Sequence, residues 1–187
     1  MTGAGKSLAW LELDEEEGRE YWQAMTLAGD YAAANHHIIH HRMEAALGLQ
    51  AAWRVENHHN FAWQEPQEQG PPLVIHRKGA TPATPGTLGI IPGSMTAPAF
   101  IVRGKGNEAS LHSAAHGAGR RFSRNQAKKH FTPAALEKHL KKYGVSLIGG
   151  ATDEAPMAYK NIEQVMQAQA DLVDPIARFY PQIVRMA

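Results

Sequence analysis

Apolar positions recur at helical spacing through residues 14–48 and predict one long helix. The residues that form this apolar stripe are Trp22, Met25, Leu27, Ala28, Ala32, Ile38, Ile39, Met43 and Leu47. Asp14 and Glu17 have the spacing of a capping box, and Gly48 is a natural helix end. The pattern therefore predicts a helix that begins near Asp14 and ends near Gly48.

After this helix, short apolar runs alternate with stretches rich in glycine and proline. We expect residues 51–65 to be irregular or a short strand, and residues 73–75, 88–91, 99–103 and 145–148 to be strands. Residues 79–98 should be mostly loop around the strand at 88–91. Thr132 and Pro133 predict a helix start and Gly144 its end, and residues 161–172 predict another helix. This alternation predicts an α+β fold.

The composition is that of a globular chain. The chain has 187 residues, of which 43% are hydrophobic and 20% charged, enough for a real core. Its net charge is only +1, so any nucleic-acid binding must come from a local patch. The absence of cysteine excludes disulfides and thiolate metal sites and fits a cytoplasmic location. No apolar run has the length of a membrane span, so we expect no membrane partner.

His116 opens the run HGAGR at residues 116–120 and is the sharpest candidate for chemistry. The glycines leave room for a phosphate to approach the imidazole and the backbone N–H groups. Arg120 and Arg124 lie four residues apart, which is one face if the segment is helical. Arginine is the side chain best shaped to bind phosphate oxygens in pairs. This run therefore indicates a nucleophilic or ligating imidazole with a phosphate clamp beside it.

Two further groups stand out among the eleven histidines. Residues 36–41 (HHIIHH) place two histidine pairs at helical spacing, which suits metal binding. We favour the alternative, a polar helix face beside a buried stripe of Ile38 and Ile39. In residues 57–63 (NHHNFAW), neighbouring histidines would point in opposite directions if the segment is extended. Since one imidazole is not a metal site, His59 either joins ligands from elsewhere or is a hydrogen-bonded polar residue.

Three glycine-containing loops are weaker candidates for phosphate binding. Residues 76–80 (HRKGA) and 89–95 (GIIPGSM) would put basic groups, a hydroxyl and backbone donors at strand ends. Ordinary solvated turns would explain them equally well. Residues 3–7 (GAGKS) look like the end of a P-loop, but the first glycine and the preceding strand of that motif are missing. We interpret this last match as chance.

Taken in order, these segments resemble the RtcB family of GTP-dependent RNA-splicing ligases. The series is HHNFA, HRKGAT, GIIPGSM, FIVRGKGNEAS, HGAGRRFSR with QAKK, and DEAPMAYKNIEQVM, over about residues 53–184. The stretch YWQAMTLAGDYAAANHHII resembles the family helix that precedes them. The resemblance implies one domain over residues 1–187, equivalent to the C-terminal part of the RtcB fold. It would comprise the helix at 14–48, a nucleotide and RNA site within 53–130, and helices and strands over 131–187.

The resemblance also implies an activity and a set of site residues. The family joins RNA 3′-phosphate (or 2′,3′-cyclic phosphate) and 5′-hydroxyl ends in RNA splicing or repair. His116 would attack the α-phosphate of GTP and carry GMP, and His59 would be a ligand of Mn²⁺. Arg120 and Arg124 would hold the RNA phosphates. The implied nucleotide contacts are Asn60, Pro92, Gly93, Ser94, Met95, Gly117, Ala118 and Gly119.

The chain also departs from the family pattern. The aspartate–cysteine pair and the histidines of the GNHF-like and HSGSR-like segments, which supply most of the family's two-manganese site, are absent. Thr96 and Ala99 replace a common glycine and serine, and the tail ends Arg185-Met186-Ala187 where the family usually has a guanine-reading lysine.

We therefore expect little activity from the chain alone, and an exposed apolar face that favours self-association or a partner. Three hypotheses stay open. The chain is a ligase whose N-terminal half is missing from this chain or supplied by another one, or a non-catalytic nucleotide- or RNA-binding module, or a metal-binding protein centred on residues 36–41.

Overall fold

A computed structural model describes residues 10–67 and 70–186 of the chain. Its contacts group the chain into two compact units, residues 1–54 and residues 55–187. The P-loop-like residues 3–7 lie outside the described residues. The single domain expected over residues 1–187 stays a prediction, and the two units are described one at a time.

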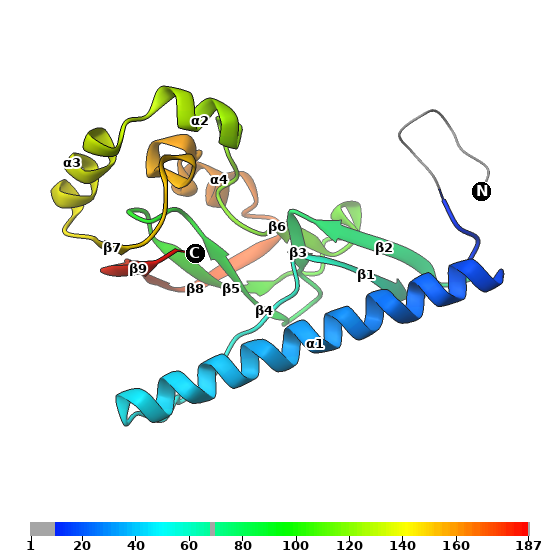
Figure 1. The fold of residues 1–187 in the computed structure, drawn as a ribbon. Coiled ribbons are helices and arrows are strands. Elements are labelled where there is room, and N and C mark those ends of the chain that lie inside the picture. Colours follow the sequence, from blue (N-terminus) through cyan, green and yellow to red (C-terminus); the bar gives the residue numbers. More distant parts are fainter. Residues whose placement is uncertain (1–9, 68–69, 187) are drawn as a thin grey trace. The chain divides into compact units, whose positions relative to one another are not determined.

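The first unit contains the long helix that the apolar pattern predicted. Helix α1 (Glu16–Leu47) is drawn in blue to cyan in Figure 1. It ends as expected, with Gly48 in the left-handed conformation at φ 63°. The predicted capping box is wrong, because the N-cap residue is Glu15 and no side chain caps the helix. Glu16 and Glu17 lie in the first turn, where negative charge interacts favourably with the helix dipole.

The apolar stripe of α1 is largely exposed. Within this helix the buried residues are Gly18 and Gly29, whereas the Leu27 side chain is 71% exposed. The buried stripe of Ile38 and Ile39 that we favoured is wrong, since both are exposed. The physical reason is that residues 10–54 include no second helix or strand against which the stripe could pack.

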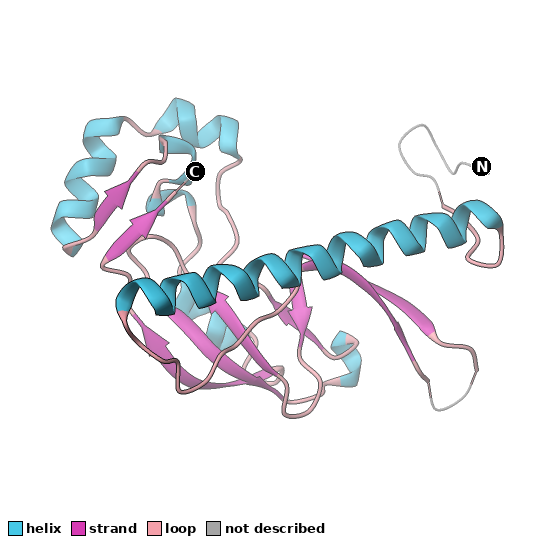
Figure 2. Cartoon of the chain, turned by 60° about the horizontal axis from the view of Figure 1, so that its bottom comes forward, coloured by secondary structure: helices cyan, strands magenta, loops and turns pink. Residues whose placement is uncertain are grey.

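The second unit confirms the α+β fold, with short strands joined by long loops (Figure 2). Strand β5 (Ala99–Gly104) pairs antiparallel with β4 (Leu88–Pro92) on one side and β8 (Val173–Phe179) on the other. The other pairs are β1 (Asn60–Glu65) with β2 (Leu73–Lys78), β3 (Ala80–Pro82) with β6 (Ser113–Ala115), and β7 (Ser146–Ile148) with β9 (Ile183–Arg185), of which only the last is parallel. The helices are α2 (Arg124–His130), α3 (Pro133–Tyr143) and α4 (Ile162–Ala168), and the 3₁₀ turns are η1 (Glu108–Ser110), η2 (Thr152–Glu154) and η3 (Pro156–Ala158).

Two apolar clusters form the core of this unit. The first joins β4, β5 and β8 to α4 and contains Ala83, Ile91, Phe100, Val102, Ala114, Ala118, Ile162, Met166 and Val173. The second joins α3 and β7 to the loop after β4 and contains Met95, Leu136, Leu140, Val145 and Ala155. Two predicted site residues, Met95 and Ala118, are therefore core residues that anchor the loops on which they lie.

A buried arginine on β2 connects the β1–β2 hairpin to residues 111–113 through hydrogen bonds. The Arg77 side chain is almost wholly buried, and its Nε donates to Ser113 Oγ at 2.8 Å. Its two terminal nitrogens donate to Glu65 Oε1 at 2.6 Å and to the Leu111 carbonyl at 2.9 Å. The guanidinium also lies 5.0 Å from the ring centre of Trp63. All three nitrogens are thus used inside the protein.

We expect Arg77→Met to lower the free energy of unfolding by about 3 kcal/mol, because it leaves the Glu65 carboxylate, the Leu111 carbonyl and the Ser113 hydroxyl without their common donor. Denaturant unfolding followed by circular dichroism would measure the change. The matched control is Arg103→Met, at an exposed position on β5, with an expected change within about 0.5 kcal/mol. Equal losses in the two variants would contradict a structural role for the Arg77 contacts.

Candidate functional site

The fold brings His59 and His116 side by side. Their ring centres lie 5.3 Å apart and their planes are inclined by only 12°. His59 directly precedes β1, and His116 directly follows β6. The stacked pair unites the predicted metal ligand and the predicted nucleophile.

Gly79, between β2 and β3, holds the backbone of both histidines. Its N–H donates to the His59 carbonyl at 3.1 Å, and its carbonyl accepts from the His116 N–H at 3.4 Å. Gly79 has φ 76°, in the left-handed region, and a Cβ there would lie 3.6 Å from the His116 ring. The positive φ favours glycine at this position, and the two backbone hydrogen bonds of Gly79 keep the HRKGAT segment beside His116.

The two loops expected to bind the nucleotide also lie against each other. The Ala118 N–H donates to the Pro92 carbonyl at 3.0 Å, and a Cβ on Gly117 would lie 3.1 Å from the same oxygen. On the other side, the Gly93 N–H donates to the Pro98 carbonyl at 3.0 Å. These glycines permit close contact between protein loops, a role that does not depend on a ligand.

The remaining predicted nucleotide contacts differ in their exposure. Asn60 is exposed beside His59, and Ser94 is half-buried in a turn closed by the Ala97 N–H. The Met95 side chain is buried in the second apolar cluster.

Arg120 and Arg124 do not share a helix face, because α2 begins only at Arg124. Arg120 is instead extended and forms a β-bridge with Tyr159. Its Nε donates to the Phe122 carbonyl at 3.0 Å. Its other nitrogens donate to Glu154 Oε2 at 3.2 Å, to the Tyr159 hydroxyl at 3.1 Å and to the Asp153 carbonyl. The Arg120 guanidinium is thus engaged within the protein.

Arg124 is paired with the same acidic turn but remains open to solvent. One of its nitrogens lies 3.1 Å from Asp153 Oδ2 and 2.6 Å from Glu154 Oε1. The Arg124 side chain is 67% exposed, against 13% for each acidic side chain. Sequence reasoning did not single out Asp153 and Glu154, although both belong to the DEAP segment of the resemblance. The acidic turn η2 therefore orients both predicted phosphate ligands.

Tyr159 links Glu154 to Arg120. Its hydroxyl donates to Glu154 Oε2, and burial, together with this carboxylate, raises the pKa of Tyr159 to about 12 from an ordinary 10.0. Since the pKa in the folded state is the higher one, the folded state favours the protonated phenol. The stability that this gives is complete below pH 10 and is lost as the pH rises from 10 to about 12.

We therefore expect Tyr159→Phe to flatten the fall in stability over this alkaline range. Denaturant unfolding at several pH values, with tyrosinate absorbance as a second readout, would measure it. Tyr143→Phe, an exposed tyrosine on α3, is the control and should leave the slope as in the wild type. Unchanged slopes in both variants would contradict the perturbed phenol.

The described residues do not form a metal site by themselves. Among residues 10–67 and 70–186, no three His, Asp or Glu side chains gather closely enough to hold a metal ion. The histidines of residues 36–41 therefore build no such cluster within this part of the chain, and His59 has too few companions for a divalent ion. A manganese site at His59 would need ligands from beyond the described residues.

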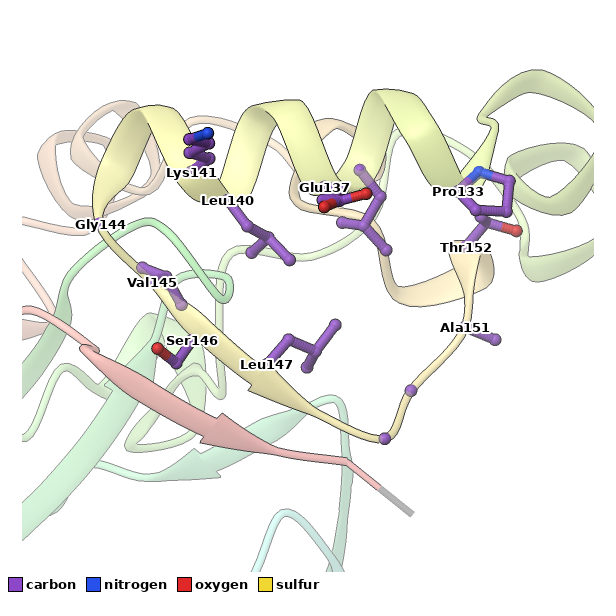
Figure 3. Close-up of a pocket in the computed structure, with 13 residues that line it drawn as sticks. Pro133, Glu137, Leu140, Lys141, Gly144, Val145, Ser146, Leu147, Ala151 and Thr152 are labelled. Atoms are coloured by element: carbon purple, nitrogen blue, oxygen red, sulfur yellow. The ribbon is translucent and has the colours of Figure 1, made fainter.

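A pocket of about 870 Å³ lies between α3 and β7, away from the predicted site residues, none of which lines it. Leu140 points into it from α3 and Leu147 from β7 (Figure 3). Leu136 and Leu140 also belong to the second apolar cluster, so the pocket is an open side of the core. Across the described ranges, no helix is both long and apolar enough to cross a membrane.

Comparisons with known proteins identify relatives of this chain. A model of the family described as tRNA-splicing ligase RtcB matches residues 3–187. The RNA-splicing ligase RtcB of Escherichia coli (strain K12) is 37% identical over 186 residues, covering 94% of this chain and 45% of that relative. The tRNA-splicing ligase RtcB of Methanococcus maripaludis is 34% identical over 191 residues, covering 86% and 40%. The RNA-splicing ligase RtcB of Mycobacterium tuberculosis is 30% identical over 202 residues, covering 94% and 47%. The chain therefore spans less than half the length of these relatives.

Proposed function

The chain belongs to the RtcB family of tRNA-splicing ligases, and from this premise we propose that it supplies the nucleophilic histidine of a GTP-dependent RNA ligase. The observation that carries the proposal is the stacked pair of His59 and His116 beside the two glycine loops. A nucleophile needs an unhindered imidazole and donors that neutralise charge on the phosphate. His116 is only half-buried, and the backbone of residues 117–119 follows it directly.

In the proposed reaction, a ring nitrogen of His116 attacks the α-phosphorus of GTP. An N–P bond forms, the bond to the leaving oxygen breaks, and pyrophosphate departs. The GMP is then transferred to the oxygen of an RNA 3′-phosphate, which restores the imidazole. The 5′-hydroxyl of a second RNA end attacks the activated phosphate and releases GMP. Arg124, with its solvent-exposed guanidinium, is the arginine better placed to contact RNA.

Manganese is part of the family chemistry that we expect, but the described residues do not fit a metal ion alone. We therefore propose that a second polypeptide segment supplies the remaining ligands and that His59 completes the set. No step above depends on a metal held by this chain by itself.

The test uses GTP labelled with radioactive phosphorus at the α-phosphate, with Mn²⁺ present. The remaining portion of the E. coli relative is added as a separate chain, or fused ahead of this chain. We expect acid-labile label on this chain after denaturation only when that portion is present. Absence of label in all arrangements would contradict the proposed ligase chemistry.

A second candidate, a non-catalytic RNA- or nucleotide-binding module, is favoured by one observation, the lack of a metal-binding cluster among the described residues. It predicts salt-sensitive RNA binding with no covalent label under any arrangement. Undetectable binding of both RNA and GTP would contradict this second candidate.

A further inference from the structure

We propose that Lys160 is a phosphate-binding cation of the loop that follows His116. Its ligand would be a terminal phosphate group, either the 3′-phosphate of an RNA end or a phosphate of the bound nucleotide. The proposal rests on the proposed function and extends it to a residue outside the glycine loops and the arginine pair.

The position of Lys160 ties it to this loop. Lys160 lies between η3 and α4, and its N–H donates to the Gly119 carbonyl at 3.0 Å. Gly119 has φ 69°, and a Cβ built on it would lie 3.9 Å from Lys160 Nζ and 4.0 Å from its Cδ. The side chain of Lys160 therefore lies against the loop of residues 117–119, next to Gly119, which is three residues after His116 in the sequence.

In the part of the chain that the structure describes, the charges around the loop leave Lys160 without a carboxylate partner. Arg120 is paired with Glu154, and Arg124 with both Asp153 and Glu154, so the formal charges of these four side chains cancel. Lys160 is exposed, and within the described residues no carboxylate lies within ion-pair distance of its ammonium group. It is therefore an uncompensated cation whose ammonium group lies next to Gly119 of this loop.

An uncompensated lysine next to backbone donors suits a phosphate monoester. The ammonium group acts as a compact point charge with three donors, which it can direct at a terminal oxygen without fixed geometry. Arg120 and Arg124 already hold Asp153 and Glu154, and an incoming phosphate would have to compete with these carboxylates for the two guanidinium groups. Binding at Lys160 requires no such exchange.

The experiment measures binding of the full chain to a short single-stranded RNA by fluorescence anisotropy. One RNA ends in a 3′-phosphate and its twin in a 3′-hydroxyl. We expect the wild type to prefer the 3′-phosphate about tenfold, equivalent to about 1.4 kcal/mol. Lys160→Ala should lose most of this preference, and Lys160→Arg should retain part of it. Lys138→Ala, an exposed lysine on α3, is the matched control and should behave as the wild type.

Competition by GTP identifies the source of the phosphate. If Lys160→Ala weakens GTP competition and leaves the 3′-phosphate preference intact, the ligand is the nucleotide phosphate and the proposal stands in that form. If Lys160→Ala changes neither quantity, the proposal is overturned, whereas labelling of His116 in the separate assay would still support the proposed function. Loss of both binding and labelling in the wild type would overturn the proposed function itself.

Discussion

His116→Ala is expected to abolish covalent attachment of GMP to the chain, the largest effect predicted for any single substitution. Alanine has no nitrogen to form the N–P bond, and the neighbouring His59 is held by Gly79 in a parallel stack. The measurement is the amount of acid-labile label retained after denaturation, with the complementary portion of the E. coli relative present. We expect a fall of at least about a thousandfold, since removal of a nucleophile leaves only background reactions.

Two further variants sharpen this result. His130→Ala removes an exposed imidazole that stacks on Phe122 at the end of α2, and it should retain full labelling. His59→Ala keeps the proposed nucleophile and removes the proposed metal ligand, so its labelling should recover in part when the Mn²⁺ concentration is raised. Label that persists in His116→Ala would place the nucleophile elsewhere in the chain.

The sequence predicted correctly those helices and strands whose ends are marked by capping residues or by short apolar runs within the element. Thr132 caps α3 by accepting the Ala135 N–H at 3.2 Å, Pro133 is its first residue, and Gly144 ends it with φ 67°. The strands at residues 88–91 and 99–103 were likewise found within one residue of β4 and β5. In each case the capping residue or the short apolar run lies within the element itself.

Elements that depend on distant partners were missed or misplaced. Strands β3, β6, β8 and β9 and helix α2 were not predicted as such. Helix α4 ends at Ala168, earlier than the predicted residue 172. The buried Gln169 that follows it accepts the Ala115 N–H at 2.9 Å, which ties this end of α4 to β6. The local pattern of apolar residues does not reveal contacts between residues that lie far apart in the sequence, so it could not predict these element ends.

In the candidate site, too, local features were predicted correctly and contacts between distant residues were not. His116 and its glycines were evident from the HGAGR run, because small residues beside an imidazole are a local feature. The spacing of Arg120 and Arg124 suggested a shared helix face, and this was wrong because the N-cap of α2 is Ser123. The acidic turn that holds both arginines lies about thirty residues further along the chain, so only the fold reveals it.

Arg120→Ala is expected to lower the free energy of unfolding by about 3 kcal/mol, because it removes several hydrogen bonds at once and leaves Glu154 with one cation fewer. Arg178→Ala is the matched control, since its pair with Glu163 is half-exposed on both sides, with 51% and 52% of the side chains accessible. A pair of that kind contributes under about 1 kcal/mol. Denaturant unfolding of both variants measures the contrast.

A double-mutant cycle separates a scaffold role of Arg120 from a role in binding RNA. If Arg120 acts chiefly on Glu154, then Arg120→Ala and Glu154→Gln should show a coupling of at least about 1 kcal/mol in unfolding. In RNA binding, Arg124→Ala should reduce the slope of log affinity against log salt concentration by about one. The reason is that the exposed Arg124 side chain would release about one counterion when it contacts an RNA phosphate. A stable Arg120→Ala variant that loses RNA binding as completely as Arg124→Ala would contradict the scaffold role. In that case the loop after His116 would be positioned by Ala118, which is buried in the first apolar cluster and donates its N–H to the Pro92 carbonyl.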